Sequence, residues 1–419
     1  MQRPDDEAAT AFNDALKCVL RFGALMLRAG TTAFRVRAGM GAIARAMGIE
    51  GLAVHIMLGG MTVTGRSGDA QATLASEIAP LGINAWRIGA LERLAHTAEI
   101  GVSPRTVAAR LDAIEIEPAV HSLAQILAAV GAASGAVSYL NGGGPLVILA
   151  SVIGGAIGQT VRLLFLRRRL NQYAVTAVCA VIASGSYCLI AATLSRAGFP
   201  VPREAAGFIC SVLFLVPGFP LVAALLDLVQ HQTPAGIARL AYGGLVLVAA
   251  AFGLSLVAAA ADLSAQTSPP LPLSEAATLV LRAVASAVGA SGFAMLFNSS
   301  WRTVLAVGGL ALVGNEVRLA LRDAGMPLAL ATFVGALIVG LLASLVRDRL
   351  HEPRIALTVP GIIVMVPGMY AFQTVVLFNQ GDALAGLRTA VLGGFVVGAM
   401  AAGLAAAHFV SERGWLVES

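Results

Sequence analysis

A segment of 29 residues recurs in this chain after 150 residues, and it carries a helix-breaking dipeptide. Residues 216–244 match residues 366–394 at eight positions without a gap, beginning with Val216-Pro217-Gly218 and Val366-Pro367-Gly368. Both copies place Pro-Gly inside a long apolar run, where Pro lacks a backbone donor and Gly costs helix entropy. Duplicated, interrupted apolar helices are typical of membrane transporters built from two repeats.

The composition places most of the chain in a membrane. It has 58% hydrophobic and 12% charged residues, with a mean hydropathy of +0.82, outside the range of ordinary soluble domains. Residues 1–121 carry 24 charged side chains, and the longer stretch 122–409 carries another 24. We therefore expect a near-neutral soluble domain before an arginine-rich membrane domain. The net charge of +5 then reflects arginines at membrane loops, and no nucleic-acid-binding face is expected.

The sequence lacks the motifs of several function classes. The first seven residues are acidic and polar with no apolar segment behind them, so no cleavable signal peptide is expected. The four cysteines match no metal motif and are interpreted as small apolar residues. Gly142-Gly143-Gly144 lacks the Lys-Ser/Thr of a phosphate loop. With no nucleotide fingerprint, cofactor or metal site, an ion gradient is the expected source of energy.

Ten apolar runs are long enough to cross a hydrocarbon core of roughly 30 Å. They fall at 122–140, 144–166, 172–194, 205–229, 236–261, 274–297, 300–321, 326–346, 355–379 and 385–409. Residues 262–273, with three prolines, are interpreted as a linker between two sets of five. An odd number of spans per set turns the second set upside down relative to the first.

The predicted fold is therefore a mainly α-helical polytopic membrane protein. Ten transmembrane helices form two inverted five-helix repeats, preceded by a small α+β soluble domain. The expected boundaries are 1–120 for the cytoplasmic domain, 121–261 for repeat one, 262–273 for the linker and 274–410 for repeat two.

Arginine placement predicts the orientation, because cytoplasmic loops are enriched in basic residues. A cytoplasmic N-terminus places ten arginines on the inner side and five on the outer side. The inner set is Arg162, Arg167, Arg168, Arg169, Arg239, Arg302, Arg347, Arg349, Arg354 and Arg413. The prediction is a multi-pass protein of the plasma (inner) membrane with both termini in the cytoplasm.

A second motif also occurs twice. Residues 158–163 read GQTVRL and residues 314–319 read GNEVRL, at the ends of the second and seventh predicted spans. In an inverted repeat one copy approaches the inner face and the other the outer face. Arg318 on the outer side is then a consequence of duplication.

The N-terminal 120 residues have mixed α and β patterns. Helical spacing of apolar residues predicts a helix over 8–28, with Gly30 after it and Thr31 or Thr32 capping a second helix through Met47. The runs 52–58 and 61–65 predict a hairpin turning at Gly59-Gly60. Further helices are expected at 83–97 and from Ser103-Pro104 to Ile114. Nothing in this domain forms a convincing active site.

With these pieces assembled, the whole chain resembles the threonine/serine exporter family. The resemblance rests on Leu27–Thr32 running to Ala46–Ile49, on Val216-Pro217-Gly218 with Asp227, and on Val359–Gly368. One departure is Arg37, where family members often have Glu. The resemblance implies a proton-motive-force-driven exporter of small hydroxy amino acids. A related two-component version exports a dicarboxylate, so export of a small carboxylate-bearing metabolite is the implied activity.

The two Pro-Gly breaks are the first candidate substrate-binding elements. A broken helix exposes unpaired N–H groups at a half-helix start, which attract a carboxylate together with the helix dipole. Pro217, Gly218, Pro367 and Gly368 are therefore candidate binding residues. The alternative is a kink that eases helix packing.

Polar side chains in the predicted spans supply the other candidates. Gln159 with Arg162, and Asn315 with Arg318, could clamp a carboxylate symmetrically, although interfacial snorkelling explains such arginines equally well. Neutral hydrogen bonds to the substrate would come from Gln373 and Asn379. Asp227 is the candidate proton carrier because an acid within a span is costly unless it is functional; the alternative is a helix-end residue. Glu316 is a second proton-coupling candidate that could also neutralise Arg318.

Three functions are compatible with these observations. A secondary active exporter of small amino acids such as threonine and serine is the favoured hypothesis, with a small dicarboxylate such as succinate as an alternative substrate. A passive channel or scaffold would show no accumulation. An enzyme would need clustered acid and base residues in 1–121, where only dispersed ones occur. The expected partners are the lipid bilayer, the small-molecule substrate and, in a homo-oligomer, a second copy of the chain.

Overall fold

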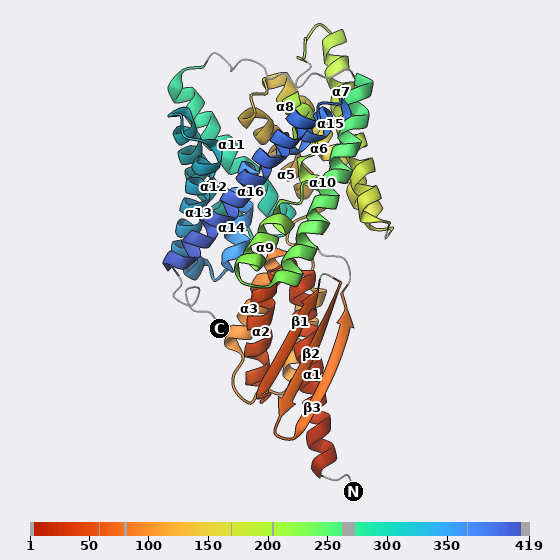
Figure 1. Cartoon of the computed structure of the whole chain (residues 1–419), viewed down its shortest axis with the longest axis vertical. Coiled ribbons are helices and arrows are strands. Elements are labelled where there is room, and N and C mark those ends of the chain that lie inside the picture. The colour runs from red at the N-terminus through yellow and green to blue at the C-terminus, as the bar shows by residue number, and fades with distance from the viewer. Residues whose placement is uncertain are drawn as a thin grey trace.

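The computed structural model describes residues 4–57, 59–78, 82–168, 170–202, 205–261, 273–366 and 368–411. A long helical part stands on a smaller N-terminal part that contains a sheet (Figure 1). The elements of the N-terminal part are α1 (Pro4–Arg28), α2 (Ala33–Ala46), β1 (Gly51–Met57), β2 (Gly60–Ser67), β3 (Ala70–Glu77), α3 (Ala85–Thr97) and α4 (Pro104–Ile116).

The helices of the N-terminal part form where apolar spacing and capping residues predict them. Leu16 and Val19 of α1 are fully buried in the core that α1 shares with α2 and the sheet. Ser103 caps α4 by accepting a hydrogen bond from the Thr106 N–H at 3.2 Å, with Pro104 in the first turn. Thr32 is the N-cap of α2 as predicted, but its side chain makes no capping hydrogen bond.

The sheet has three antiparallel strands in the order β1-β2-β3. Val63 of β2 pairs with Val54 of β1 on one side and with Leu74 of β3 on the other. The sequence predicts only the first two strands. β3 was missed because AQATLASE contains few of the β-branched and aromatic residues that mark strands.

Within the described residues, eight helices are long and apolar enough to cross a membrane. They are α5 (Leu123–Leu140), α6 (Pro145–Leu166), α7 (Gln172–Arg196), α10 (Thr233–Ala261), α11 (Glu275–Leu296), α12 (Trp301–Asp323), α13 (Leu328–Leu350) and α16 (Ala383–Ser411). These eight coincide with eight of the ten predicted apolar runs, so the chain is a multi-pass membrane protein by the length and composition of its helices.

The two remaining runs are interrupted. The first contains α8 (Ala205–Cys210), the 3₁₀ turn η1 (Leu213–Leu215) and α9 (Gly218–Val229). The second contains α14 (Arg354–Ile362), the 3₁₀ turn η2 (Ile363–Met365) and α15 (Gly368–Asn379), with a bend of 49° between its two halves. Pro217 is the N-cap of α9, which confirms the predicted break there. Pro367 lies outside the described residues.

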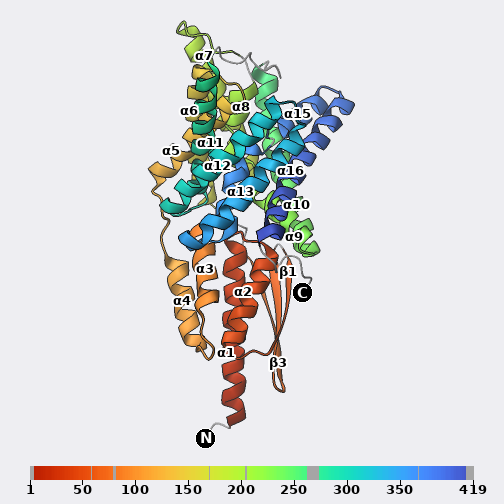
Figure 2. The ribbon, with the colours of Figure 1, turned by 90° about the vertical axis from the view of Figure 1, so that its left-hand side faces the viewer.

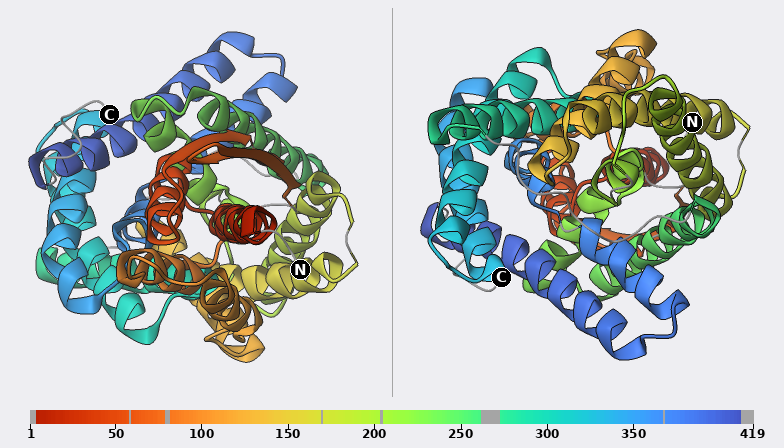
Figure 3. Two further views of the ribbon diagram at one scale, coloured as in Figure 1. Left: turned by 90° about the horizontal axis from the view of Figure 1, so that it is seen from below. Right: turned by 90° about the horizontal axis from the view of Figure 1, so that it is seen from above.

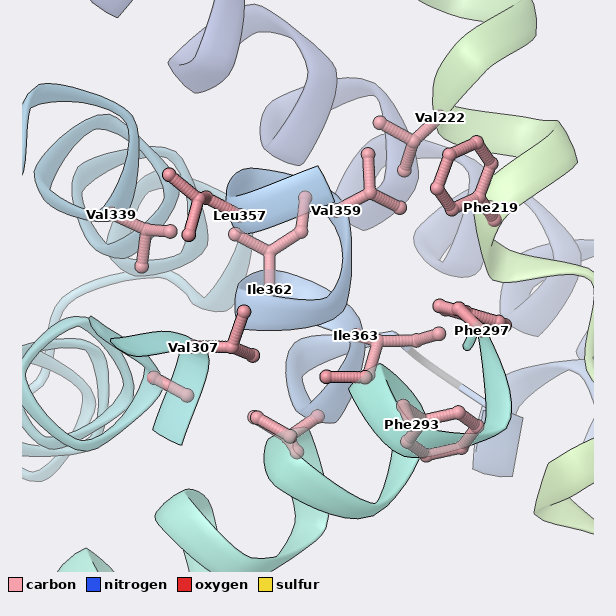
Figure 4. Packing of buried hydrophobic residues seen from close by; sticks show 14 of the residues in the cluster. Phe219, Val222, Phe293, Phe297, Val307, Val339, Leu357, Val359, Ile362 and Ile363 are labelled. Atoms are coloured by element: carbon pink, nitrogen blue, oxygen red, sulfur yellow. The ribbon is translucent and has the colours of Figure 1, made fainter. Parts of the chain in front are cut away.

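The two interrupted runs meet each other in the core. A Cβ added to Gly218 would lie 3.1 Å from Ile363 and 3.5 Å from Val366. A Cβ added to Gly368 would lie 3.8 Å from Leu213 and 4.0 Å from Val216. We call these six residues the central crossing. Ile363 lies beside Phe293 and Phe297 in the surrounding apolar cluster (Figure 4).

The N-terminal part packs against one end of the helical part (Figures 1 and 2). The Ala85 N–H donates to the Phe297 carbonyl oxygen at 2.8 Å, and Arg93 donates to the His351 carbonyl oxygen at 3.1 Å. Arg37 donates to Gln232 at 3.2 Å. The connections after α9, α11 and α13 therefore share the end that faces the N-terminal part.

The two sets of membrane helices lie mainly on opposite sides of the long axis. Viewed along that axis, residues 123–261 (gold to green) and residues 275–411 (blue-green to blue) lie mainly on different sides of the assembly (Figure 3). Helix α5 packs against α11, so the first helices of both sets are in contact. The N-terminal part lies in front of this assembly at one end only.

Candidate functional site

Two cavities of about 380 Å³ each flank the central crossing. This volume falls within the usual range of small-molecule sites, roughly 300–1,000 Å³. The proximal cavity lies next to the N-terminal part, and its polar lining residues are Gln159, Arg162, Gln172, Thr176, Arg239 and Tyr242. The polar lining residues of the distal cavity are Asn141, Asn315, Arg318, Arg322, Tyr370 and Gln373.

Residues at matching positions of the two sequence repeats line the two cavities. The GQTVRL motif at the end of α6 places Gln159 and Arg162 in the proximal cavity, and GNEVRL in α12 places Asn315 and Arg318 in the distal one. Each cavity also has two arginines and one tyrosine among its lining residues, and no Asp or Glu among the described residues lines either. Both cavities therefore suit a carboxylate group.

Arg162 and Gln159 leave unused hydrogen-bonding capacity in the proximal cavity. Arg162 makes no hydrogen bond or ion pair with another described residue, and the buried Gln159 Oε1 has no partner. Elsewhere in the lining of this cavity, Gln172 Nε2 donates to the Tyr242 hydroxyl. A buried polar group without a partner is costly, so this cavity is prepared for a polar ligand.

Arg239 and Asp227 form a buried pair beside the proximal cavity. Arg239 is 2% exposed and Asp227 is fully buried, with 3.6 Å between Arg239 Nε and Asp227 Oδ2. Arg239 also donates to the Thr31 carbonyl oxygen at 2.5 Å, and Asp227 Oδ1 accepts from the Ala33 N–H at 2.7 Å. Arg239 lines the cavity, whereas Asp227 lies behind it.

In the distal cavity the equivalent arginine is held by neighbours. Arg318 donates to Thr332 and to Asn315, both at 3.0 Å. Asn315 in turn donates to Ser286 at 2.8 Å. Arg318 is therefore held in position by hydrogen bonds before any ligand binds, in contrast to Arg162.

The predicted residues at the helix breaks have distinct positions. Pro217 lines the proximal cavity, while Gly368 and Gln373 line the distal cavity. The Gly218 N–H donates to the Val216 carbonyl oxygen at 2.8 Å, and the Gly368 N–H bonds Val366 in the same way at 2.9 Å. These two N–H groups are thus already satisfied in this conformation. Asn379 ends α15, and its side chain lies outside what the structure describes.

The surroundings of three charged side chains differ from what the sequence suggested. Glu316 makes no ion pair with Arg318, and its buried Oε1 has no partner within the described residues. Arg239 and Arg354, expected at cytoplasmic loops, are 2% and 1% exposed. Arg354 donates to the Gly340 carbonyl oxygen at 2.9 Å and to Ser411 at 2.7 Å. The count of arginines on each side of the membrane does not separate these buried arginines from loop arginines.

Sequence reasoning missed seven polar cavity residues: Asn141, Gln172, Thr176, Arg239, Tyr242, Arg322 and Tyr370. Arg239 follows Asp227 by twelve residues across a short turn, and this pair of opposite charges within two adjoining apolar segments was the available signal. No group of three or more His, Cys, Asp or Glu side chains that could hold a metal ion is present in the described part of the chain.

Outside the membrane helices, Glu352 joins the helical part to α3. Burial raises the pKa of the Glu352 carboxyl, while Arg93 and hydrogen bonds from Thr303 and Ser300 act in the opposite direction. The Ser300 hydroxyl donates to Glu352 at 3.3 Å. Glu352 is also close to Gly89, because a Cβ added there would lie 2.7 Å from its carboxylate.

A multi-pass helical protein with polar cavities on both sides of a broken-helix crossing has the architecture of a membrane transporter. The sequence comparisons agree. The profile described as "Putative threonine/serine exporter" matches residues 17–261, and that described as "Threonine/Serine exporter, ThrE" matches residues 282–410. The chain belongs to the threonine/serine exporter family, which is a family of membrane exporters and not of enzymes.

Two curated relatives show partial similarity. A protein of Mycobacterium tuberculosis named "Probable threonine/serine exporter" is 28% identical over 333 residues, which are 73% of this chain and 58% of that protein. An "Uncharacterized protein" of Haemophilus influenzae is 32% identical over 129 residues, 29% of this chain and 43% of that protein. The chain thus spans about half the length of these relatives. No solved structure matches it.

Proposed function

We propose that this protein is a secondary active exporter of small amino acids such as threonine and serine. The observation that carries the proposal is the pair of cavities on either side of the central crossing, each lined by two arginines and by no Asp or Glu among the described residues. Guanidinium groups bind a carboxylate bidentately, and the amide and hydroxyl side chains serve the amino and hydroxyl groups of the substrate. Membership in the exporter family supports the same substrate class.

The proposed architecture is ten membrane segments in two inverted halves, with boundaries at 1–120, 121–261, 262–273 and 274–410. The reciprocal contacts of Gly218 and Gly368 support it. A further pair does so as well: a Cβ on Gly253 of α10 would lie 2.4 Å from the Ala177 carbonyl oxygen, and one on Gly403 of α16 would lie 2.5 Å from that of Phe333. The two glycines are 150 residues apart, as are the two Val-Pro-Gly segments. Their partners Ala177 and Phe333 are 156 residues apart, as are the GQTVRL and GNEVRL motifs.

The central crossing is the proposed barrier of an alternating-access cycle. Leu213, Val216, Ile363 and Val366 separate the two cavities with apolar side chains. Movement of the half-helices at Gly218 and Gly368 would open the barrier to one cavity at a time. Pro217 and Pro367 would permit that movement, because no hydrogen bond to a proline nitrogen has to be broken.

Specific residues receive roles in this proposal. Arg162 with Gln159 binds the carboxylate in the proximal cavity, and Arg318 with Asn315 binds it in the distal cavity. Gln373 and Asn379 add neutral hydrogen bonds on the distal side. Asp227 and Glu316 are the proposed proton-coupling groups, supported by the burial of Asp227 beside Arg239 and by the unpartnered Oε1 of Glu316.

The proposed location is the plasma (inner) membrane, with the N-terminal part in the cytoplasm. Exposed Arg167, Arg168 and Arg349 at the end facing the N-terminal part support this orientation. The proximal cavity then faces the cytoplasm and the distal cavity faces outward. Exposed apolar residues along the membrane helices are available to lipid and, in a homo-oligomer, to a second copy of the chain.

Reconstitution into liposomes tests the proposal. Radiolabelled threonine, serine and succinate are followed with and without an imposed pH gradient. The proposal requires accumulation of threonine or serine that collapses when a protonophore removes the gradient. Accumulation of succinate alone would identify the dicarboxylate alternative, and equilibration without accumulation in either condition would identify a passive channel.

A further inference from the structure

The first turn of α2 is capped by the membrane part of the chain. A helix leaves its first N–H groups without partners inside the helix, and the N-cap side chain of Thr32 does not supply one. Asp227, at the end of α9, accepts the Ala33 N–H at 2.7 Å instead. A carboxylate at a helix N-terminus also gains from the helix dipole.

Arg239 completes this contact from a second membrane helix. It donates to the Thr31 carbonyl oxygen at 2.5 Å and lies 3.6 Å from Asp227. The two charges are almost completely buried, and no other acidic residue pairs with Arg239 in the described chain. Because unpaired buried charges are strongly unfavourable, separation of the N-terminal part from α9 and α10 requires both groups to find new partners.

Gly30, just before α2, and a second segment before α3 form a wall of the proximal cavity. Gly30, Gly82 and Ile83 line that cavity, whereas none of the described residues of 4–120 lines the distal one. Gly30 has φ +95°, and a Cβ there would lie 2.7 Å from the Gly82 carbonyl oxygen. The turn is therefore a tight backbone surface with no room for larger side chains at this position.

We propose that the Gly30–Ala33 turn is a gate over the proximal cavity, latched by Asp227 and Arg239, with Arg239 as the positioning residue. The role of the gate in transport rests on the proposed function; the latch itself does not. Arg239 faces both the latch and the cavity. A substrate carboxylate that reaches Arg239 competes with Asp227 for the guanidinium, so binding weakens the latch and opens the proximal side.

A labelling experiment tests the latch without any transport measurement. Cys18, Cys188 and Cys210 are replaced by serine, and Thr31→Cys introduces a reporter at a buried position whose hydroxyl has no partner. Native Cys179, fully buried in α7, remains as an internal monitor of unfolding. The full-length protein in detergent is treated with a small maleimide, and mass spectrometry follows both thiols.

The latch predicts slow labelling of position 31 in the parent. Asp227→Asn and Arg239→Gln should each accelerate it at least about tenfold, which corresponds to roughly 1.4 kcal/mol, while Cys179 stays unreactive. Arg239→Lys keeps the charge and should restore much of the protection. Arg37→Gln is the matched control, because exposed Arg37 bonds Gln232 across the same interface without touching Asp227. Unchanged labelling in both Asp227→Asn and Arg239→Gln would overturn the latch.

Substrate addition and crosslinking then test the gate. Threonine or serine should accelerate labelling of position 31 in the parent and have no further effect in Arg239→Gln. A reducible bis-maleimide that joins Arg37→Cys to Gln232→Cys in a background lacking the native cysteines should stop transport in liposomes, and reduction should restore it. Full transport by crosslinked protein would overturn the gate while leaving the exporter proposal standing. If the reduced protein without the crosslink also failed to transport, that result would count against the exporter proposal. The labelling of position 31 would still test the contact of Asp227 and Arg239 with the turn.

Discussion

Arg162 and Arg318 occupy matching motif positions but differ in their partners. Arg162 has none among the described residues, whereas Arg318 is bonded to Asn315 and Thr332. We expect Arg162→Gln to reduce threonine transport at least about tenfold with little change in thermal stability. Arg318→Gln should reduce transport and also cost about 1.5–3 kcal/mol of stability, because hydrogen bonds to a charged group are lost. Liposome uptake and thermal unfolding of the purified proteins measure the two effects, and Arg168→Gln in an exposed loop is the control. Equal stability loss in both variants would contradict this difference.

Glu352 predicts a pH-dependent contribution at the contact between α3 and the loop after α13. Burial raises its pKa in the folded state, so its contribution to stability is present below the unfolded pKa and is lost as pH rises through the folded pKa. Glu352→Gln imitates the neutral form and should be more stable than the parent at neutral pH, with a flatter stability profile between about pH 4 and 8. Thermal unfolding across that range measures the profile. The prediction would be contradicted if the parent protein became more stable as the pH rises through this range. It would also be contradicted if the stability of Glu352→Gln depended on pH as steeply as that of the parent.

At the scale of elements, close helix contacts depend on glycines in α10 and α16. Gly253→Ala and Gly403→Ala would place a Cβ 2.4 and 2.5 Å from backbone carbonyl oxygens of the neighbouring helices. Each substitution should lower stability by about 1–3 kcal/mol, the usual cost of overpacking. Gly244→Ala and Gly394→Ala are matched controls in the same two helices, because nothing lies within 4 Å of a Cβ there. Thermal unfolding of the four variants in detergent measures the contrast, which would be refuted by equal stability in all of them.

The sequence predicts the elements better than their contacts. Apolar length located the eight long helices, and Pro217-Gly218 located the break before α9, because both are local properties of the chain. The contact of Asp227 with Ala33 joins residues 194 positions apart, and no local pattern reveals such a partner. Thr31 or Thr32 was the expected cap of α2, but the acceptor of the Ala33 N–H is Asp227 of a distant helix. The matched lining of the two cavities could be predicted from the sequence, because the GQTVRL and GNEVRL motifs place Arg162 and Arg318 at equivalent positions.

At the scale of the whole molecule, the two cavities differ in what closes them. The central crossing is common to both, but among the described residues the N-terminal part contributes a wall only to the proximal cavity. Because of this asymmetry, the N-terminal part can restrict access to the proximal cavity but not to the distal one, although the membrane helices are repeated. In the proposed exporter, access to the cavity on the side of the N-terminal part therefore has a control that the other cavity lacks.

Sidedness is the prediction that follows at this scale. The connections after α6 and α9 should be cytoplasmic, because the arginines at 167 and 168 and the Arg37–Gln232 contact place them at the end of the N-terminal part. The connections after α7 and α15 lie at the other ends of adjoining helices and should face outward. Single cysteines at Arg168, His231, Phe199 and Asp382 are treated in intact cells with a membrane-impermeant maleimide. Positions 199 and 382 should react, while 168 and 231 should react only after the cells are permeabilised, which also controls for accessibility. Reaction at 168 and 231 in intact cells would show that the orientation is the reverse of the predicted one. The proximal cavity would then face outward, and the Gly30–Ala33 gate would control access from outside the cell.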